Sequence, residues 1–509
     1  VMYQQGHISP LQGRKNSGSF SGRFDSNALF SQDQSPLPVR RRSSVCLAIV
    51  DDIPEAVVNS GETVLLLRKE QLQTIKSLLL RIWPKQRTVV GLRTCKWLRA
   101  GLIARTNDVM ELHAKGHQGI VDVDEDEIVK DLQRTCHWKK QIAFKCGQKT
   151  RKIDSSIRLT LFSALTTAVP SLQSSLVEID LSAWGAEITG ALWGMLAEAL
   201  GECKGLECLD VSQNEMGDES AVKVVAALGG CERLRRLNLA ENQVGVEKLE
   251  PLASALGRCM ALEELDVSRN PIGNDGLLQL LPAIRRESLV KLSVEKVSVL
   301  GHGLQVLSDL LAGCPSLTHL SIKNNRDAGS GGGHEQLQPG IASCVHLLDL
   351  DVSWNRWGTC KASVQSLVAS LASLHALQSI NLSFSGVGAG MGPDGITLLA
   401  EALGECKDLR RVNLEENNMG AGGMEGLAKV LRAGKLPRLE SLNIAGNILG
   451  PRGAESMARV LGSGCCARLK SLNLARNVFE SQGMAALAKV MDHCPRLAYL
   501  NMAGNTISH

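Results

Sequence analysis

The amino-acid sequence predicts a curved α/β solenoid, with short parallel strands on its concave face and helices on its convex face. Three observations favour this class. Leucines in the spacing L-x-x-L-x-L recur about every 30 residues from Leu176 onward, and apolar residues at helical spacing follow each group. The chain has 509 residues, too many for one ordinary core. Hydrophobic residues make up 44% and aromatic residues 3%, so the core has to be built from Leu, Val and Ala.

Residues 233–259 illustrate one unit. Leu234, Leu237 and Leu239 have the spacing of a short strand that enters a core, and Asn242 then begins the turn that leaves the strand. A helix is expected next, and Cys259 closes the unit. Such a unit cannot bury its apolar face alone, so it must stack on its copies. The apolar positions of the expected helix are Leu249, Leu252, Ala253 and Leu256.

The pattern L-x-x-L-x-L-x-x-N-x-x-G, followed by L-x-x-x-L-x-x-C, resembles the ribonuclease-inhibitor class of leucine-rich repeats. That class includes ribonuclease inhibitor, the Ran GTPase-activating proteins and the sensor ends of NOD-like receptors. The resemblance covers residues 176–509 and implies the horseshoe fold, but it leaves the function open, because fold does not determine function. The first leucines of the units are Leu176, Leu206, Leu234, Leu262, Leu289, Leu317, Leu347, Leu377, Leu409, Leu439, Leu469 and Leu497.

An asparagine follows almost every predicted strand. Its buried amide is expected to satisfy backbone groups of the adjoining turn. Trp184, Val297 and Ser385 interrupt this series. The asparagines are Asn214, Asn242, Asn270, Asn325, Asn355, Asn417, Asn447, Asn477 and Asn505.

A cysteine precedes the first leucine of most units by three residues, which indicates a small buried apolar position. Neighbouring copies would face the same way, a poor geometry for disulfides, so we expect a reducing compartment, the cytosol or the nucleus. The cysteines are Cys203, Cys231, Cys259, Cys314, Cys344, Cys406, Cys466 and Cys494.

Residues 1–60 are rich in Ser, Gly, Gln, Pro and Arg and predict a disordered tail. Arg41 and Arg42 precede Ser44, an arrangement that resembles a basophilic kinase site; a solvated basic patch is the alternative. The tail lacks the apolar stretch of a signal peptide. Because the chain begins at Val1, a start further upstream stays open.

Residues 61–106 predict a small helical unit, since apolar residues recur there at helical spacing on both sides of Pro84. The segment resembles an F-box. That resemblance implies that Leu72, Ile75 and Leu79 bind the adaptor of a cullin–RING ubiquitin ligase. The alternative is a helical cap that covers the first strand of the solenoid. The resemblance is carried by Leu67, Glu70, Leu72, Ile75, Leu79, Cys95 and Trp97.

Residues 107–175 predict degenerate first repeats. Strands are expected within 108–116 and 140–147, and helices within 125–136 and 155–169. The acidic run at 122–127 fits the start of a helix, where the helix dipole favours negative charge. A calcium site is the alternative, although the spacing is not that of an EF-hand loop.

The sequence contains no catalytic motif. G-x-x-x-x-G-K-[ST], G-x-S-x-G and H-E-x-x-H are all missing, and the glycine-rich stretch 329–333 has no Lys-Ser or Lys-Thr after it. A zinc site could be imagined from scattered residues near 113–146, but their spacings fit no zinc module. We therefore expect no cofactor and no metal. The residues in question are His113, His117, Cys136, His137 and Cys146.

The concave face is the predicted binding surface, because side chains between the strand leucines point from it. Asp and Asn recur in its central column, which includes Asp351 and Asn381. In the next column only Trp354 and Phe384 are aromatic, and they occupy neighbouring units. The nearby glycine-rich segment 384–395 is expected as an irregular loop that departs from the array. We expect these two rings to form a partner-binding hot spot with Asp351, Asn381 and Arg356 around them. The alternative is that both rings pack over Trp357, which is expected in the core.

These observations predict a non-enzymatic scaffold that binds a protein partner on its concave face, with the F-box-like segment as a possible link to a ubiquitin ligase. The rival prediction is an activator of small GTPases that resembles the Ran GTPase-activating proteins. The net charge of +4 is too weak to indicate nucleic-acid binding. No apolar window reaches the roughly 20 residues of a membrane helix.

Overall fold

The computed structural model describes the backbone of six strands between residues 46 and 145, and residues 155–505 apart from 186, 247–248, 300 and 326–333. The chain divides into two compact units, residues 1–45 and 46–509, and all described residues belong to the second.

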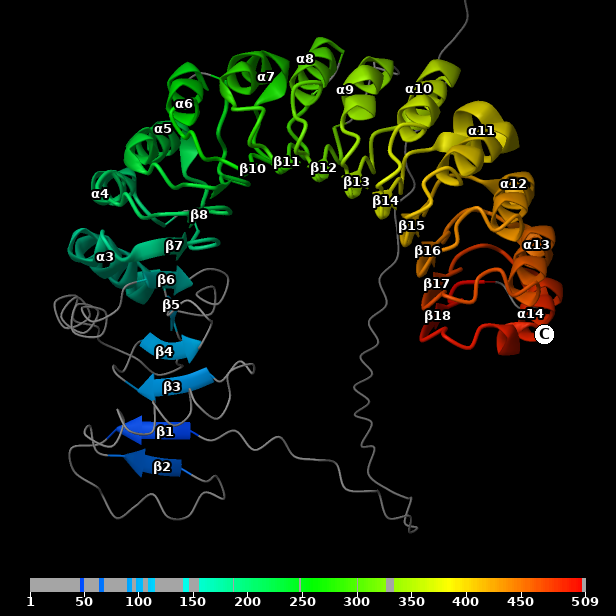
Figure 1. Ribbon diagram of the computed structural model, residues 1–509, viewed down its shortest axis with the longest axis horizontal. Coiled ribbons are helices and arrows are strands. Elements are labelled where there is room, and N and C mark those ends of the chain that lie inside the picture. The colour runs from blue at the N-terminus through cyan, green and yellow to red at the C-terminus, as the bar shows by residue number, and fades with distance from the viewer. Residues whose placement is uncertain are drawn as a thin grey trace, which may run out of the picture. The chain divides into compact units, whose positions relative to one another are not determined.

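A long parallel sheet forms the inner side of the repeat array (Figure 1). Neighbouring strands follow one another in chain order, and equivalent residues of successive repeats lie side by side. The strands are β7 (Leu176–Asp180), β8 (Cys208–Asp210), β9 (Arg236–Asn238), β10 (Glu264–Asp266), β11 (Lys291–Ser293), β12 (His319–Ser321), β13 (Asp349–Asp351), β14 (Ser379–Asn381), β15 (Arg411–Asn413), β16 (Ser441–Asn443), β17 (Ser471–Asn473) and β18 (Tyr499–Asn501).

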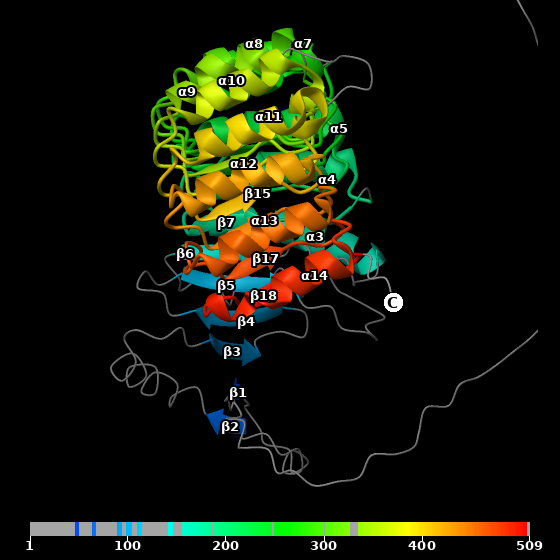
Figure 2. The same ribbon diagram turned by 90° about the vertical axis from the view of Figure 1, so that its right-hand side faces the viewer.

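Helices cover the outer side of the array and stack one beside the next (Figure 2). They are α3 (Ser155–Leu172), α4 (Gly190–Leu200), α5 (Gly217–Ala227), α6 (Leu249–Leu256), α7 (Gly273–Leu280), α8 (His302–Leu311), α9 (Gln338–Ser343), α10 (Lys361–Leu371), α11 (Val387–Leu403), α12 (Gly420–Arg432), α13 (Gly450–Gly462) and α14 (Glu480–Ala488). Strands pack about 4.8 Å apart whereas helices need about 8–10 Å, so this arrangement has to curve. The predicted α/β solenoid is therefore confirmed.

The repeat leucines form the core. In a typical strand such as β16, the central residue Leu442 is buried while Ser441 and Asn443 face outward. Leu439 and Leu461 are buried as well, so each repeat contributes both its strand and its helix to one continuous core. At the N-terminal end of the described array, Phe162 packs edge-on against Trp184 and Trp193, with ring centroids 5.6 and 5.0 Å apart.

The asparagine series behaves as predicted. The side-chain amide of Asn447 donates to the carbonyl oxygens of Leu414 at 2.8 Å and Ile444 at 3.0 Å. Its oxygen accepts the backbone N–H groups of Asn417 at 2.9 Å and Met419 at 3.2 Å. One buried amide thus satisfies backbone groups of two repeats, where a strand ladder no longer supplies partners.

The repeat cysteines are buried and unpaired, as expected. Most of their thiols point to carbonyl oxygens, as Cys314 Sγ does to Leu310 O at 3.2 Å. Burial raises the pKa of Cys203 and Cys259 to about 11 each. These thiols are therefore small, neutral core groups.

The segment before the array differs from the sequence prediction. Strands β2 (Val64–Leu67), β3 (Val89–Arg93) and β4 (Leu98–Ile103) occur within 61–106, where a helical unit was expected. Strand β1 (Cys46–Ile49) lies in the expected disordered tail and pairs in parallel with β2. β3 and β4 are antiparallel. The physical reason is the apolar alternation within 89–103: short apolar runs fit strands as well as helices, and pairing favours strands.

The degenerate first repeats follow their predicted course where the structure describes them. Strands β5 (Val109–Ala114) and β6 (Gln141–Lys145) and helix α3 occur where they were expected. In contrast, residues 384–395 were expected as an irregular loop, but most of them form the start of α11. The helix is interrupted at Gly392, whose φ is +60°, just before Pro393. Residues 68–88, with Leu72, Ile75 and Leu79, lie outside the described residues.

Candidate functional site

One column of residues runs along the edge of the concave face in an unusual conformation. We call it the outer column. Its members lie directly before the asparagine position, and all have a left-handed φ between 49° and 69°. The backbone N–H of each member except Gly504 donates to a carbonyl oxygen of the next repeat, as Trp354 N–H does to Ser383 O at 2.9 Å. The outer column is Ala183, Gln213, Glu241, Arg269, Lys296, Asn324, Trp354, Phe384, Glu416, Gly446, Arg476 and Gly504.

Trp354 and Phe384 are stacked on one another. Their ring centroids lie 3.9 Å apart and their planes differ by 15°. Both side chains are partly buried. The expected contact between the two rings is therefore confirmed, while their binding role stays a prediction.

The expected core position of Trp357 is also confirmed. Its side chain is fully buried, its Nε1 donates to Val352 O at 3.2 Å, and its ring lies 4.9 Å from that of His334.

The aromatic pair occupies backbone positions that bulky side chains seldom adopt. A left-handed conformation costs an L-residue roughly 1–2 kcal/mol, which is why glycine occupies the same column at Gly446 and Gly504. Neither ring lies among the buried core residues. The pair thus shares the left-handed conformation of the whole outer column, and its two rings lie outside the core.

Asp351 and Asn381 hold the strand ends beneath the rings. Asp351 Oδ1 accepts the N–H and the hydroxyl of Ser353 at 3.0 and 2.6 Å, and Asn381 Oδ1 does the same for Ser383 at 3.1 and 2.9 Å. Asn381 Nδ2 donates to Asp351 Oδ2 at 2.9 Å. These two predicted site residues therefore tie adjacent repeats together.

The other predicted site residues differ in how far the structure describes them. Arg356 is exposed, has a φ of 51° and directly precedes the buried Trp357. Ser44, Leu72, Ile75 and Leu79 lie outside the described residues. The same holds for the residues considered above as zinc ligands, apart from the backbone of His113 in β5.

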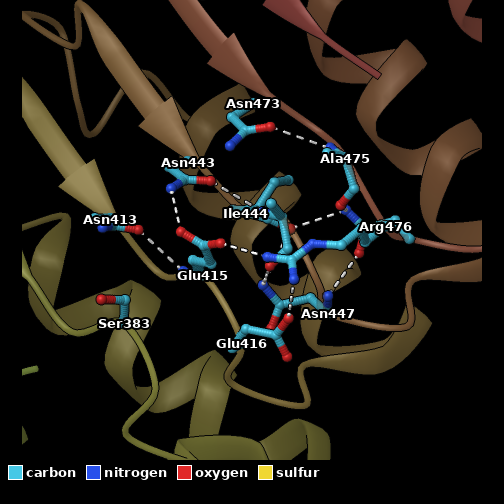
Figure 3. Close-up of polar contacts among 12 residues, drawn as sticks. Ser383, Asn413, Glu415, Glu416, Asn443, Ile444, Asn447, Asn473, Ala475 and Arg476 are labelled. Carbon is cyan, nitrogen blue, oxygen red and sulfur yellow. Dashed lines mark hydrogen bonds and ion pairs between the residues drawn. The ribbon is translucent and has the colours of Figure 1, made fainter. Parts of the chain in front are cut away.

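A charged cluster next to the aromatic pair was missed by the sequence prediction (Figure 3). Arg476 reaches Glu415 with an Nη2–Oε1 distance of 2.5 Å and Glu416 with an Nη1–Oε1 distance of 3.2 Å. Asn443 Nδ2 donates to Glu415 Oε2 at 3.0 Å. The signal that could have found it is the outer column, where Glu416 and Arg476 flank Gly446 with opposite charges.

Gly446 makes room for this cluster. A Cβ atom at this position would lie only 2.3 Å from Glu416 Oε1, so the carboxylate occupies the space of the missing side chain. The φ of Gly446 is +63°, which glycine adopts without strain.

The N-terminal half of the concave face carries a shallow groove that extends from β7 to β13. Its floor includes Asp266, whose pKa is raised chiefly because the carboxylate is buried. Arg236 and Lys291 line the same groove, so both charge signs are present.

Two kinds of site are not found among residues 155–505 as the structure describes them. No group of three or more His, Cys, Asp or Glu side chains is placed to hold a metal ion. None of the described helices is long and apolar enough to span a membrane.

Comparison with known proteins finds matches to the repeat region of this chain. The family model described as Leucine Rich repeat matches residues 203–225, 258–281, 405–428, 435–458 and 466–488. A Rho GTPase-activating protein, gacW of Dictyostelium discoideum, is 28% identical over 167 residues, which cover 28% of this chain and 15% of that protein. The chain therefore spans a small part of that relative's length.

Two solved structures are similar at low identity. An internalin (inlF) of Listeria monocytogenes is 16% identical, with a TM-score of 0.37, over 66% of this chain and 83% of that chain. The leucine-rich repeat-containing protein LegL7 of Legionella pneumophila is 19% identical, with a TM-score of 0.37, over 55% and 86% respectively. The five segments that match the family model each contain a strand and a helix of the array, so this chain carries leucine-rich repeats.

Proposed function

We propose that this chain is a non-enzymatic scaffold that binds a protein partner on its concave face, with Trp354 and Phe384 as the hot spot. The observation that carries the proposal is their stacking at 3.9 Å in left-handed positions outside the core. Aromatic side chains are enriched at hot spots, where truncation often costs about 2 kcal/mol or more. Asp351 and Asn381 would hold the rings in place, and Arg356 would extend the surface.

The test is the double variant Trp354→Ala, Phe384→Ala, assayed against the partner identified by affinity purification and mass spectrometry. We expect near-native melting and binding weakened about thirtyfold, since about 2 kcal/mol corresponds to that ratio. Tyr499→Ala is the matched control, because this exposed aromatic residue lies on β18, the C-terminal edge strand of the sheet, away from β13 and β14. Lowered melting with unchanged affinity would mean that the rings only pack locally, and the proposal would fail.

A second candidate is an activator of small GTPases. Its support is the 28% identity to a Rho GTPase-activating protein, which covers 15% of that relative. The test is single-turnover GTP hydrolysis by purified Rho and Ran GTPases with and without this chain. Acceleration by several orders of magnitude would favour this candidate, and unchanged rates would remove it.

An adaptor-binding role for Leu72, Ile75 and Leu79 rests on the sequence pattern alone. The strands β2, β3 and β4 in the same segment speak against an all-helical F-box. Leu72→Asp with Ile75→Asp should abolish pull-down of a cullin adaptor while the array stays folded. Unfolding of residues 107–200 in this variant would instead indicate a cap.

A further inference from the structure

We propose that the partner presents an arginine side chain to the face of Phe384 that Trp354 does not cover, with Glu416 and Glu415 as its counter-charges. This inference rests on the proposed function and deepens it, because it specifies the chemistry of the partner.

The order of the repeats places Glu415 and Glu416 in the repeat that follows Phe384, on the side opposite Trp354. Trp354 belongs to the repeat before Phe384, and stacks on it from that side. On the opposite side, the backbone N–H of Phe384 donates to Glu415 O at 2.8 Å. Glu416 is the next member of the outer column after Phe384. The second face of the phenyl ring is therefore directed toward the repeat that carries both glutamates.

The charge around this face is negative. Arg411 Nη2 lies 3.6 Å from Asp349 Oδ2, and Arg476 contacts both glutamates. With the exposed Arg356, three cations accompany four carboxylates in these neighbouring repeats, so the formal charge is 3 − 4 = −1. Glu416 pairs with Arg476 through Oε1, and among the described residues no hydrogen bond or ion pair is made to its Oε2. Its side chain is 33% exposed, so that oxygen can accept a hydrogen bond from a partner. The four carboxylates are those of Asp349, Asp351, Glu415 and Glu416.

The carboxylates are held in place before a partner arrives. Glu415 is fixed by Asn443 and Arg476 through its two oxygens. Glu416 lies over Gly446, where any other residue would place a Cβ. Arg476 itself passes over Gly504, whose Cβ would meet its Cγ at 3.0 Å. Pre-ordered groups lose little entropy on binding, so they contribute more to affinity than mobile ones.

An aromatic face beside carboxylates suits a guanidinium group best. Its planar surface stacks on a ring, while its N–H groups form charge-assisted bonds in the same plane. An ammonium group would gain the charge attraction without the stacking and the forked geometry. A neutral or acidic side chain would meet the net negative charge with no compensation. The site therefore fits a segment of a partner protein that carries an exposed arginine.

The experiment uses the full chain and three fluorescently labelled nonapeptides of Gly and Ser with one central residue, Arg, Lys or citrulline. Citrulline keeps the shape of arginine and removes its charge. Fluorescence anisotropy at low salt should give the tightest binding for the Arg peptide, about tenfold weaker binding for the citrulline peptide, and an intermediate value for Lys. Added salt should weaken the binding, because exposed charges are screened.

Variants of the chain locate the binding. Phe384→Ala should weaken the binding of the Arg peptide about tenfold, and Glu416→Gln should weaken it about threefold or more. Glu219→Gln is the matched control, because it removes a carboxylate from helix α5 on the convex side, where Glu219 pairs with Lys223. This control should leave the affinity for the peptide unchanged.

Three outcomes would overturn the inference. If the citrulline peptide bound as tightly as the Arg peptide, or if Glu416→Gln had no effect, the positive charge would not be recognised by this site. No binding of the Arg peptide, together with a native partner still sensitive to the Trp354 and Phe384 double variant, would leave the proposed function intact and remove only the arginine. Much tighter peptide binding by a chain with Arg40, Arg41 and Arg42 replaced by Ala would assign the site to the chain's own arginines instead of a partner.

Discussion

The backbone N–H of Asn417 donates to the side-chain oxygen of Asn447 at 2.9 Å, across 30 residues of sequence. The same contact recurs between Asn447 and Asn477 at 2.8 Å. Each asparagine thus closes the turn of the preceding repeat as well as its own. The array is held together along its length by these buried amides in addition to its leucine core.

We predict that Asn447→Ala lowers the free energy of unfolding by about 3 kcal/mol. The variant would leave buried backbone groups on two repeats without partners, each at a cost of about 1–3 kcal/mol. Urea denaturation followed by circular dichroism measures the change. Asn505→Ala, at a partly buried position near the end of the described array, should cost clearly less. Equal losses at both positions would show that burial of the amide is not what matters.

Because the ring of His334 is buried, we expect the stability of the repeat array to fall at acid pH. Burial lowers the pKa of His334 from 6.5 to about 4, although nearby Glu335 opposes this shift. Below pH 6.5 the unfolded chain binds a proton that the folded chain does not, so stability falls as the pH drops from about 6.5 to 4. The loss should approach about 3 kcal/mol.

The measurement for His334 is the free energy of unfolding at several pH values, compared with His334→Leu. The difference in slope between the two proteins isolates this histidine from other titrating groups. His346→Leu is the control, because His346 is exposed. Identical slopes for wild type and His334→Leu would refute the prediction.

The repeat cysteines should resist alkylation in the folded protein. Burial raises the pKa of Cys231 to about 12 and that of Cys259 to about 11, and the thiolate is the reactive form. Intact mass after iodoacetamide treatment should show both thiols unmodified under native conditions and modified after denaturation. Rapid native labelling of either thiol, or masses that reveal disulfides, would contradict a buried, reduced column.

The variant Gly446→Ala should separate the effect of backbone strain from the effect of displacing the charged cluster. At a φ of +63° alanine costs about 1 kcal/mol, and its Cβ would also displace the Glu416 carboxylate. Gly434→Ala is a matched control, because its φ is +66° and no atom lies within 4 Å of the added Cβ. Thermal melting should fall alike in both variants, but only Gly446→Ala should weaken binding of the arginine peptide. The same affinity in both would argue against a role for Glu416.

Sequence patterns are weakest in the segment before the array. Apolar residues such as Val90, Leu92 and Leu102 fit helical spacing over a long window, yet over a few residues they also alternate as in a strand. Pairing with a neighbouring strand decides between the two, and a single window of sequence does not contain the neighbour. The same limit applies to residues 384–395, where glycines suggested a loop and α11 begins instead.

The repeat can be deduced from the residues alone, because the leucine, asparagine and cysteine positions follow local spacing and each position has one physical role that every copy shares. The sequence also marked Trp354 and Phe384 as unusual, because a column of equivalent positions can be read without coordinates. Which side chains from different repeats meet depends on the three-dimensional stacking of the repeats. Arg476 reaches Glu415 across 61 residues, because stacking in register and a left-handed turn in every repeat bring their columns together, while Gly446 leaves the space between them open.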